Sequence, residues 1–487
     1  MLHARDMILK QQILKHLRYF TRNITKQKPA APLTLINMPH PLSWPIVGTK
    51  LNFLVTGSST TLHDYVHQRH AQLGPIFCES LGGRTELVFV SDPQLMKSLF
   101  LNLEGKYPVH ILPEPWLLYE KLYGSKRGLF FMNGEEWLIN RRIMNKHLLR
   151  EDSDKWLEMS IKDTVSGFVQ DLKVKVGRGN FISDLESEFY RLSLNVIINI
   201  LMGTESGLMT SKHNEELLHI FSQSVKRIFE TTNRLYSMPV YWCERFNLKV
   251  WKDFKESVDL SLHLGKKIVN EMLSMRHKSN GLIGKIEEMD DTTIKSVVTD
   301  LIIAAGDTTA YTTLWILLLL SKNDEVKKEV FLNNDYVKHV VKETMRLYPV
   351  APFLTRILTK EGILGSYQLK EGTPIVASIY TSGRDERNFT RANEFLPYRW
   401  DRNDPRKQDL ANHVTSASLP FALGARSCVG KKIAMTQLSE ITQQIVNNFD
   451  FKCTNTEEVK PIMSMVLVPD QKIKLSLTEK NAMQMFN

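Results

Sequence analysis

Cysteine is scarce in this sequence, and the few cysteines lie far apart. They are Cys78, Cys243, Cys428 and Cys453, and no two of them form a C-x-x-C pair. This spacing favours neither a disulfide framework nor a zinc site, and it suits a reducing compartment. The 487 residues also contain no Gly/Ser linker, low-complexity tract or internal repeat. We therefore expect one large domain behind a short leader.

A recognisable nucleic-acid-binding motif is also missing, although the formal net charge is +10. Such a charge can serve nucleic acid, an anionic membrane surface or an acidic protein partner, and the missing motif makes nucleic acid the weakest of the three. We expect no nucleic-acid partner. Part of the charge belongs to residues 1–30, which contain seven Lys and Arg residues and the single acid Asp6.

The leader at residues 1–30 contains no apolar run of the ~20 residues that span a bilayer. Its basic residues alternate with apolar ones such as Ile8, Ile13 and Leu17, which gives a basic amphipathic pattern. That pattern is typical of a mitochondrial transit peptide. The alternative is a basic helix that lies on a membrane surface. We expect residues 1–30 to be the transit peptide and residues 31–487 to form the folded domain.

Residues 301–320 are apolar enough to be mistaken for a membrane span. Asp307 lies within this stretch, and a carboxylate near a helix centre costs roughly 2.5 to 3.5 kcal/mol on insertion scales. A long helix buried inside a large protein explains the same residues. Elsewhere, apolar runs on both sides of Gly82 and Gly83 predict a β-hairpin, and residues 151–290 predict mostly amphipathic helices.

Residues 421–434 present a lone thiol, Cys428, in a loop that leads directly into an amphipathic helix. Gly424 and Gly430 flank the thiol, and we expect positive φ at both, so that the backbone can approach a flat partner. A thiolate just before a helix N-terminus is stabilised by unpaired amides, and such a sulfur is a good ligand for iron. The alternative is an ordinary buried core cysteine. The helix is predicted by the spacing of Ala434, Leu438, Ile441 and Ile445.

The spacing of five residues favours the iron ligand. Phe421, Gly424, Arg426, Cys428 and Gly430 form the pattern F-x-x-G-x-R-x-C-x-G, which resembles the haem-binding loop of the cytochrome P450 monooxygenases. The resemblance implies that Cys428 is the axial thiolate ligand of the iron of haem b. It also implies that Phe421, Arg426 and Gly430 bind the cofactor. The fold that it implies is mainly α with a smaller β region, in a single large domain that encloses the haem.

The apolar helix extends this resemblance. Asp307 and Thr308 match the acid–alcohol pair of the family's central helix, which implies that they deliver protons to the oxygen that the haem activates. A haem-based sensor or carrier would need the iron ligand but not this pair, so the pair favours an enzyme. The family usually has Gly two residues before the acid. Here Ala305 occupies that position and Gly306 lies next to the acid, which leaves the position of the oxygen-binding kink open.

Three more residues resemble the family's contacts to the haem propionates. Trp137 and Arg141 are four residues apart on a predicted helix, so they share one face, and they match the family's W-x-x-x-R. Arg356 matches a second propionate arginine. A guanidinium suits this role because it stays charged and binds a carboxylate through two hydrogen bonds. Without the resemblance, Trp137 and Arg141 would be an ordinary packing pair.

Glu343, Arg346 and Arg399 match the family's E-x-x-R motif and its third arginine. The resemblance implies a structural role, in which the three side chains fix the segment beside the haem loop. The alternative for Glu343 and Arg346 is an exposed ion pair on a helix, which would be worth only about 0.2 to 0.5 kcal/mol.

The leader and Lys342, which precedes Glu343, resemble the mitochondrial class of the family. Members of that class take electrons from an acidic ferredoxin, and a ferredoxin reductase supplies electrons to the ferredoxin. The resemblance implies that Lys338, Lys342, Lys431 and Lys432 bind the ferredoxin on the thiolate side. The alternative is a solvated basic face. The resemblance also implies that the protein lies at the matrix face of the inner mitochondrial membrane and is peripherally associated with it.

The substrate is suggested by resemblance alone. Residues 127–131, 301–310 and 347–353 resemble those of the insect ecdysteroid 2-hydroxylases. This implies that the chain uses O2 to hydroxylate carbon 2 of 2-deoxyecdysone, a lipophilic steroid, and forms ecdysone. The alternatives are another sterol or lipophilic substrate, a haem protein without catalysis, and a membrane-surface scaffold.

Overall fold

The computed structural model describes residues 33–42, 49, 53, 58–81, 85–124, 127–150, 153–177, 182, 184–203, 212–236 and 238–480. The leader at residues 1–30 and the pair Gly82 and Gly83 lie outside this part of the chain. The described residues form a mainly helical fold with a smaller β region, as the sequence predicts.

Helices make up most of the fold, including the stretch 151–290 where the sequence predicts them. The longer ones are α3 (Leu62–Leu73), α5 (Glu114–Tyr123), α6 (Gly134–Leu148), α7 (Asp154–Gly177), α8 (Leu185–Met202), α9 (Lys212–Tyr236), α11 (Lys249–Ser274), α13 (Asp291–Ser321), α14 (Asp324–Leu332), α15 (Val337–Leu347) and α17 (Lys431–Asn448). The short ones are α4 (Pro93–Ser98), α10 (Val240–Arg245), α12 (Leu282–Lys285) and α16 (Ile379–Gly383).

The main sheet has the strand order β1-β2-β6-β3, with β1 (Ile76–Glu79), β2 (Leu87–Val90), β3 (Phe353–Ile357) and β6 (Pro374–Ser378). β2 and β6 are parallel, and the other neighbours are antiparallel. β1 and β2 pair with Ile76 opposite Val90, which confirms the pairing expected for the predicted hairpin. The remaining strands form three two-stranded sheets: β4 (Gly362–Leu364) with β5 (Tyr367–Leu369), β7 (Phe449–Cys453) with β10 (Leu475–Glu479), and β8 (Pro461–Ser464) with β9 (Val466–Pro469).

α13 is the long apolar helix that the sequence predicts. The side chain of Asp290 accepts a hydrogen bond from the amide of Thr293 and so caps its first turn. Its length and composition would allow it to cross a membrane, but 72% of its most apolar window is buried inside the protein. It packs against α8, α11 and α17. The prediction of a buried core helix is therefore confirmed.

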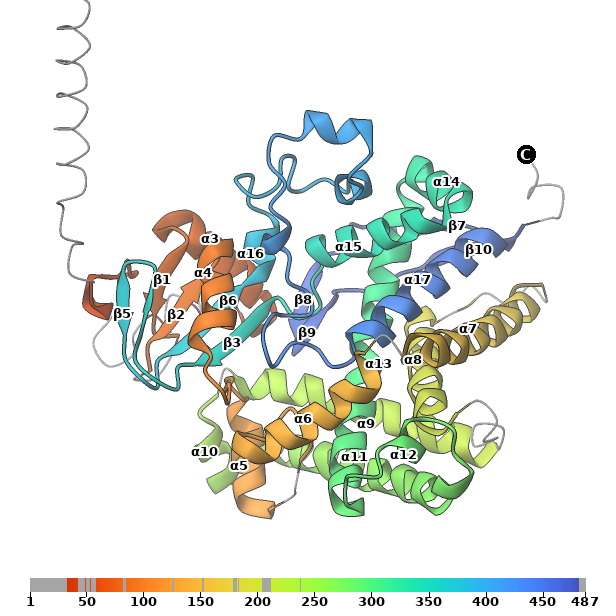
Figure 1. Cartoon of the computed structure of the whole chain (residues 1–487), viewed down its shortest axis with the longest axis horizontal. Helices are drawn as coiled ribbons and strands as arrows, with labels where there is room; N and C mark the ends of the chain where they lie inside the picture. Colours follow the sequence, from red (N-terminus) through yellow and green to blue (C-terminus); the bar gives the residue numbers. More distant parts are fainter. Residues whose placement is uncertain are drawn as a thin grey trace, which may run out of the picture.

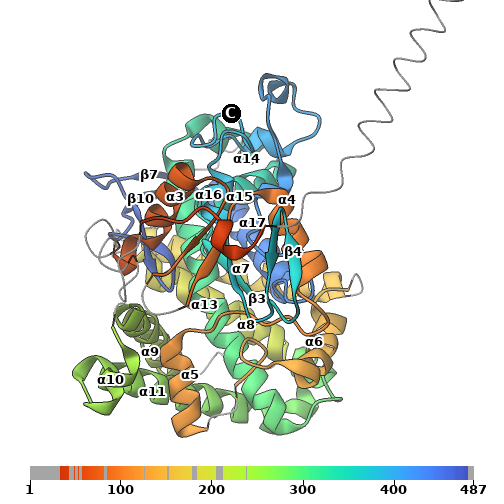
Figure 2. The ribbon, with the colours of Figure 1, turned by 90° about the vertical axis from the view of Figure 1, so that its left-hand side faces the viewer.

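The strands lie mainly on one side of the molecule, and the helices lie toward its two ends (Figures 1 and 2). The strands β1 to β6 lie with α3 and α4 on one side of the molecule, and α13 passes through the helical part (Figure 1). In the two perpendicular views, α5, α9, α10 and α11 lie together at one end, while α14 and α15 lie toward the other (Figures 1 and 2). The two ends therefore offer separate surfaces to partners.

Candidate functional site

The loop that carries Cys428 ends at the N-terminus of α17. The amide of Cys428 donates a hydrogen bond to the carbonyl of Phe421 at 2.9 Å, which closes the loop on itself. Gly424 has a φ of 79°, and a Cβ there would overlap Glu104 Oε1 and the carbonyl oxygen of Phe100. Both observations require glycine at this position.

Gly430 does not have the positive φ that the sequence predicts. It is the N-cap of α17 with φ −86° and ψ 9°, a conformation that residues with side chains also adopt. A Cβ at Gly430 would lie 3.9 Å from Cys428 Sγ, which is ordinary contact. The expectation of left-handed backbone is therefore correct at Gly424 and wrong at Gly430, because a residue at the start of a helix needs no such backbone.

Cys428 is exposed to solvent, although many protein atoms lie around its thiol. Desolvation raises the pKa of the Cys428 thiol above its usual value, and the amide of Gly430 and the charges of Arg141 and Lys431 only partly offset this. A metal ion that binds a thiol removes its proton outright. The raised pKa is therefore compatible with an iron ligand.

Two of the expected propionate arginines have unused nitrogen atoms. Arg141, on α6, donates from Nη2 to the carbonyl of Ser427 in the thiol loop. Arg356, on β3, donates from Nε to Glu104 Oε2 at 2.8 Å and from Nη1 to the carbonyl of Thr355. Arg141 Nε and Arg356 Nη2 are buried, and neither has a hydrogen-bond partner within the described part of the chain. Both atoms need an acceptor.

Glu104 links Arg356 to the thiol loop, a role that the sequence does not reveal. Its other carboxylate oxygen accepts a hydrogen bond from the amide of Ala425 at 2.6 Å. Glu104 is buried, and its segment is separated by hundreds of residues from both partners. Only the folded chain brings this carboxylate to the loop.

Arg426 binds protein atoms through all three nitrogens. Nε donates to the carbonyl of Pro108 at 2.6 Å, Nη2 donates to Asn133 Oδ1 at 2.9 Å, and Nη1 lies 3.3 Å from His110 Nδ1. The guanidinium also stacks on the ring of Trp137, with 4.5 Å between Cζ and the ring centroid. Arg426 therefore fastens the thiol loop to the start of α6.

His110 is a second residue that sequence reasoning misses. A guanidinium can only donate, so His110 Nδ1 must accept from Arg426, and the ring proton is assigned to Nε2. Burial and the charge of Arg426 lower the pKa of His110 to about 3, so the ring is neutral. Nε2 is buried and has no partner among the residues that the structure describes. It is a third donor in need of an acceptor.

Glu343, Arg346 and Arg399 meet as the sequence predicts. Arg346 donates to both carboxylate oxygens of Glu343 at 2.8 Å, and Arg399 Nε donates to Oε1 at 2.9 Å. Trp400 Nε1 and the amide of Leu396 add two more hydrogen bonds at 2.9 Å. The three charged side chains are fully buried. The alternative of an exposed ion pair is wrong, because the carboxylate is enclosed by donors on every side.

Asp307 and Thr308 are adjacent in α13 but point in different directions. Asp307 is 1% exposed, and burial raises the pKa of its carboxyl from 3.8 to about 7. Thr308 is half-buried, and its hydroxyl donates to the carbonyl of Ala304 at 3.0 Å. Ala304 is exposed although it lies in the middle of a buried helix. α13 is one continuous helix from Asp291 to Ser321, so Ala305 and Gly306 both lie within it.

Three of the four lysines expected to bind a ferredoxin share one neighbourhood. Lys342 is exposed, and desolvation by nearby protein atoms together with the charges of Lys338 and Lys431 lowers its pKa. Lys338 pairs with Asp335 at 3.2 Å on an exposed surface. Lys432 turns elsewhere and donates to the carbonyl of Arg150. The structure therefore brings Lys338, Lys342 and Lys431 together and leaves Lys432 apart from them.

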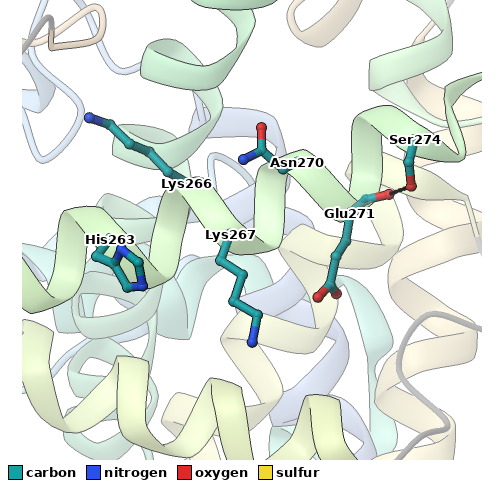
Figure 3. A pocket seen from close by; sticks show the side chains of 6 residues that line it. All are labelled: His263, Lys266, Lys267, Asn270, Glu271 and Ser274. Atoms are coloured by element: carbon teal, nitrogen blue, oxygen red, sulfur yellow. Dashed lines mark hydrogen bonds between the residues drawn. The ribbon is translucent and has the colours of Figure 1, made fainter.

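A surface depression of about 490 Å³ lies on one face of α11, away from all these residues. Figure 3 shows its lining side chains, which are His263, Lys266, Lys267, Asn270, Glu271 and Ser274. All six come from a single helix, and no residue that the sequence singles out is among them.

The cytochrome P450 family profile matches residues 38–477, which is most of the chain. The protein therefore belongs to the cytochrome P450 family, and it is a P450 monooxygenase. The family binds haem through a cysteine thiolate.

Several relatives carry the word mitochondrial in their names. "Cytochrome P450 315a1, mitochondrial" of Drosophila melanogaster is 35% identical over 93% of this chain and 90% of its own length. "1,25-dihydroxyvitamin D(3) 24-hydroxylase, mitochondrial" of Rattus norvegicus is 27% identical over 93% of this chain and 92% of its own. "Cholesterol side-chain cleavage enzyme, mitochondrial" of Oncorhynchus mykiss is 27% identical over 85% of each chain.

The residues around the thiol loop fit a haem group. A haem carries two propionate carboxylates, and Arg141 Nε, Arg356 Nη2 and His110 Nε2 are three buried donors that need acceptors. The three guanidinium groups of Arg141, Arg356 and Arg426, together with the Glu104 carboxylate, leave two positive charges to balance the two propionates. Cys428 supplies the soft ligand that iron needs.

Proposed function

We propose that this chain is a mitochondrial ecdysteroid 2-hydroxylase, which converts 2-deoxyecdysone to ecdysone with O2 and with electrons from a ferredoxin. The observation that carries the proposal is the 35% identity, over 93% of the chain, to a mitochondrial P450 of Drosophila melanogaster. The resemblance of the sequence to the insect ecdysteroid 2-hydroxylase Shadow supplies the substrate and the carbon atom.

The packing of two of the segments that carry the resemblance supports this proposal. Arg127, which begins residues 127–131, donates to Asp300 Oδ1 at 2.9 Å, and Asp300 directly precedes residues 301–310. The amide of Gly128 donates to the other oxygen at 2.6 Å, and the guanidinium stacks on Phe131 at 4.1 Å. Two segments that are far apart in the sequence thus meet at Asp300, about one helical turn before the exposed Ala304.

The bound haem would supply oxygen activation, and the chain would position it. We assign Cys428 to the iron, because its thiolate is a soft ligand. We assign Arg141, Arg356 and His110 to the propionates, because Arg141 Nε, Arg356 Nη2 and His110 Nε2 lack partners in the described structure. Asp307 and Thr308 deliver the protons that oxygen reduction consumes. Asp307 suits this role because its pKa of about 7 lets it hold and release a proton at neutral pH.

The experiment uses the purified protein with a mitochondrial ferredoxin and its reductase. 2-Deoxyecdysone should yield ecdysone, identified by chromatography and mass spectrometry against authentic ecdysone. Cys428→Ala is the control, since it should lose both the product and the red-shifted absorption of the reduced carbon monoxide complex. A product hydroxylated at another carbon, or turnover only of other sterols, would contradict the ecdysteroid assignment but not the enzyme class.

The basic patch of Lys338, Lys342 and Lys431 is the surface to which we assign the acidic ferredoxin, with Lys432 at its margin. Lys338→Glu combined with Lys342→Glu should weaken ferredoxin binding at least about tenfold at low salt, roughly 1.4 kcal/mol, because the encounter is electrostatic. Lys266→Glu with Lys267→Glu, in the depression on α11, is the matched control and should change nothing. If the two double variants bind ferredoxin with equal affinity, the lysines form only a solvated basic face.

We assign the protein to the mitochondrion, at the matrix face of the inner membrane, with residues 1–30 as the transit peptide. A surface for peripheral association is available on α10 and its C-cap Phe246, where Tyr241, Trp242 and Phe246 are 56%, 52% and 65% exposed. Such aromatic side chains bind at membrane interfaces. Trp242→Ala with Phe246→Ala should release the protein from vesicles of anionic phospholipid, and unchanged sedimentation with the vesicles would exclude this surface.

A further inference from the structure

The side of α13 that faces α8 and α9 contains a cluster of titratable side chains. Lys226 Nζ, from α9, lies 2.7 Å from Glu186 Oε1, from α8. The hydroxyl of Tyr311, from α13, donates to the same carboxylate oxygen at 2.8 Å. Three elements therefore converge on one atom of Glu186.

Asp307 lies next to this cluster. It precedes Tyr311 by four residues, so the two side chains share a face of α13. The charges of Lys226 and Glu186 act on the pKa of Asp307 in opposite directions, the lysine lowering it and the glutamate raising it. The carboxyl of Asp307 is thus within electrostatic reach of both groups.

Tyr190, from α8, completes the cluster at its inner end. A Cβ on Gly306 would lie 2.5 Å from Tyr190 Cζ and 2.7 Å from its hydroxyl, so the ring rests on the backbone next to Asp307. The Tyr190 hydroxyl and Asp307 Oδ2 are both buried, and neither has a partner among the residues described. Buried polar atoms left unpaired destabilise the fold, so their presence points to a use.

Exposure rises steadily along the cluster. Asp307 is 1% exposed, whereas the side chains of Glu186 and Lys226 are 24% and 26% exposed. On the other side, Thr308 follows Asp307 and shares the accessible face of α13 with Ala304. Asp307 therefore lies between a solvent-facing group of charges and the face on which Thr308 stands.

We propose that Lys226, Glu186, Tyr311 and Tyr190 form the route by which protons from solvent reach Asp307. The proposal rests on the role given to Asp307 under the proposed function. Hydroxylation consumes one substrate, one O2, two electrons and two protons, and it gives one alcohol and one water. The ferredoxin supplies the electrons. The two protons pass through Asp307 one at a time, and the route restores the Asp307 proton after each transfer.

The tyrosines carry protons without ionising. Each hydroxyl accepts a proton at its oxygen while it donates its own, so no phenolate forms. This matters because burial, reinforced by the charge of Asp307, holds the pKa of Tyr190 and of Tyr311 well above the usual value. Glu186 and Lys226 exchange protons with solvent at the outer end.

The same arrangement explains why position 306 is a glycine. Any side chain at this position would displace the Tyr190 ring from the backbone beside Asp307. The glycine next to the acid, which departs from the family's usual pattern, therefore makes room for a tyrosine.

The first test measures how reducing equivalents are used. Tyr311→Phe and Glu186→Gln should keep the haem content and substrate affinity of the wild type. The ratio of product to reducing equivalents should fall at least about fivefold, with hydrogen peroxide released instead, and the solvent deuterium isotope effect should rise. Tyr65→Phe is the matched control, because it removes a buried hydroxyl that is hydrogen-bonded to Glu79, far from Asp307 in the fold. Unchanged coupling and isotope effect in both variants would overturn the route.

The second test needs no substrate. The Asp307 carboxyl can be titrated by infrared spectroscopy, with the band assigned by its loss in Asp307→Asn. Lys226→Met should raise the midpoint of this titration and Glu186→Gln should lower it, because the two charges act on Asp307 with opposite sign. A midpoint that moves in neither variant would show that the cluster is not connected to Asp307. If the protein hydroxylates a steroid other than 2-deoxyecdysone, the substrate assignment fails, while both tests of the route proceed with that steroid.

Discussion

Glu343 and Asp307 are both buried carboxylates, but their surroundings differ. Glu343 accepts hydrogen bonds from two arginines, an indole and a backbone amide. Burial alone would raise its pKa, but Arg346 and Arg399 reverse the effect and hold the pKa of Glu343 below its usual value. Asp307 has an oxygen with no partner in the described structure, and desolvation raises its pKa to about 7.

The difference separates a carboxylate that holds the fold from one that can exchange a proton. A charge that is enclosed by donors is fixed, because removing either partner leaves the other buried and unpaired. A carboxyl without partners can gain or lose its proton near neutral pH, at a cost to stability that only a function would preserve. Burial is common to both, so burial alone does not distinguish them.

Removing the Glu343 carboxylate should have the largest effect on the free energy of unfolding. Glu343→Ala leaves Arg346 and Arg399 buried without their carboxylate, and we expect a loss of roughly 3 to 5 kcal/mol in the free energy of unfolding. Urea unfolding with and without haem measures it. Glu329→Ala, which removes the partly exposed partner of Arg406, is the matched control and should cost less than about 1 kcal/mol. Similar losses of stability in the two variants would show that Glu343 holds the fold no more strongly than an exposed ion pair does.

Breaking the second site should affect turnover and spare the fold. Asp307→Asn keeps the shape but cannot donate a carboxyl proton, so product formation should fall about 10²-fold. Haem content should stay near that of the wild type. A parallel loss of haem and of activity would instead give Asp307 the structural role that we assign to Glu343.

The pH dependence of stability should sharpen the contrast, since the two sites act with opposite sign. Below its folded pKa of about 7, Asp307 retains a proton that the unfolded chain releases near 3.8, so stability should fall as pH rises between these values. Glu343 has a lowered pKa, so its contribution is lost as pH falls below 4.5. Buried histidines whose pKa is lowered, such as His110, add stability as pH rises in this range, so the contribution of Asp307 has to be measured as a difference. The unfolding free energy of the wild type minus that of Asp307→Asn should fall by roughly 1 to 3 kcal/mol between about pH 5 and pH 7. A constant difference across this range would exclude Asp307 as a pH-dependent contributor.

The parts of the site that could be predicted are those encoded by local spacing. Cys428 with its loop, and Glu343 with Arg346, are recognisable because a few residues in one segment define them. His110, Glu104 and Tyr190 could not be predicted, because each acts through a residue that is distant in the sequence and adjacent only after folding. Gly430 shows a further limit, since the identity of a glycine does not reveal the sign of its φ.

The mainly helical fold and the buried α13 could also be predicted, because apolar periodicity and the position of Asp307 both follow from the sequence. Which face of α13 the acid occupies could not be predicted. Adjacent helix residues always point in different directions, but the positions of α8 and α9 decide which of them is enclosed.

The contact between Gly306 and Tyr190 limits how the two positions can evolve. A relative that gains a side chain at position 306 has no space for an aromatic ring at position 190, and a relative that loses the ring gains a void beside the acid. The two positions should therefore covary among homologues, with glycine paired to tyrosine and a larger residue paired to a smaller one. Position 306 is then constrained by the packing of Tyr190 against it.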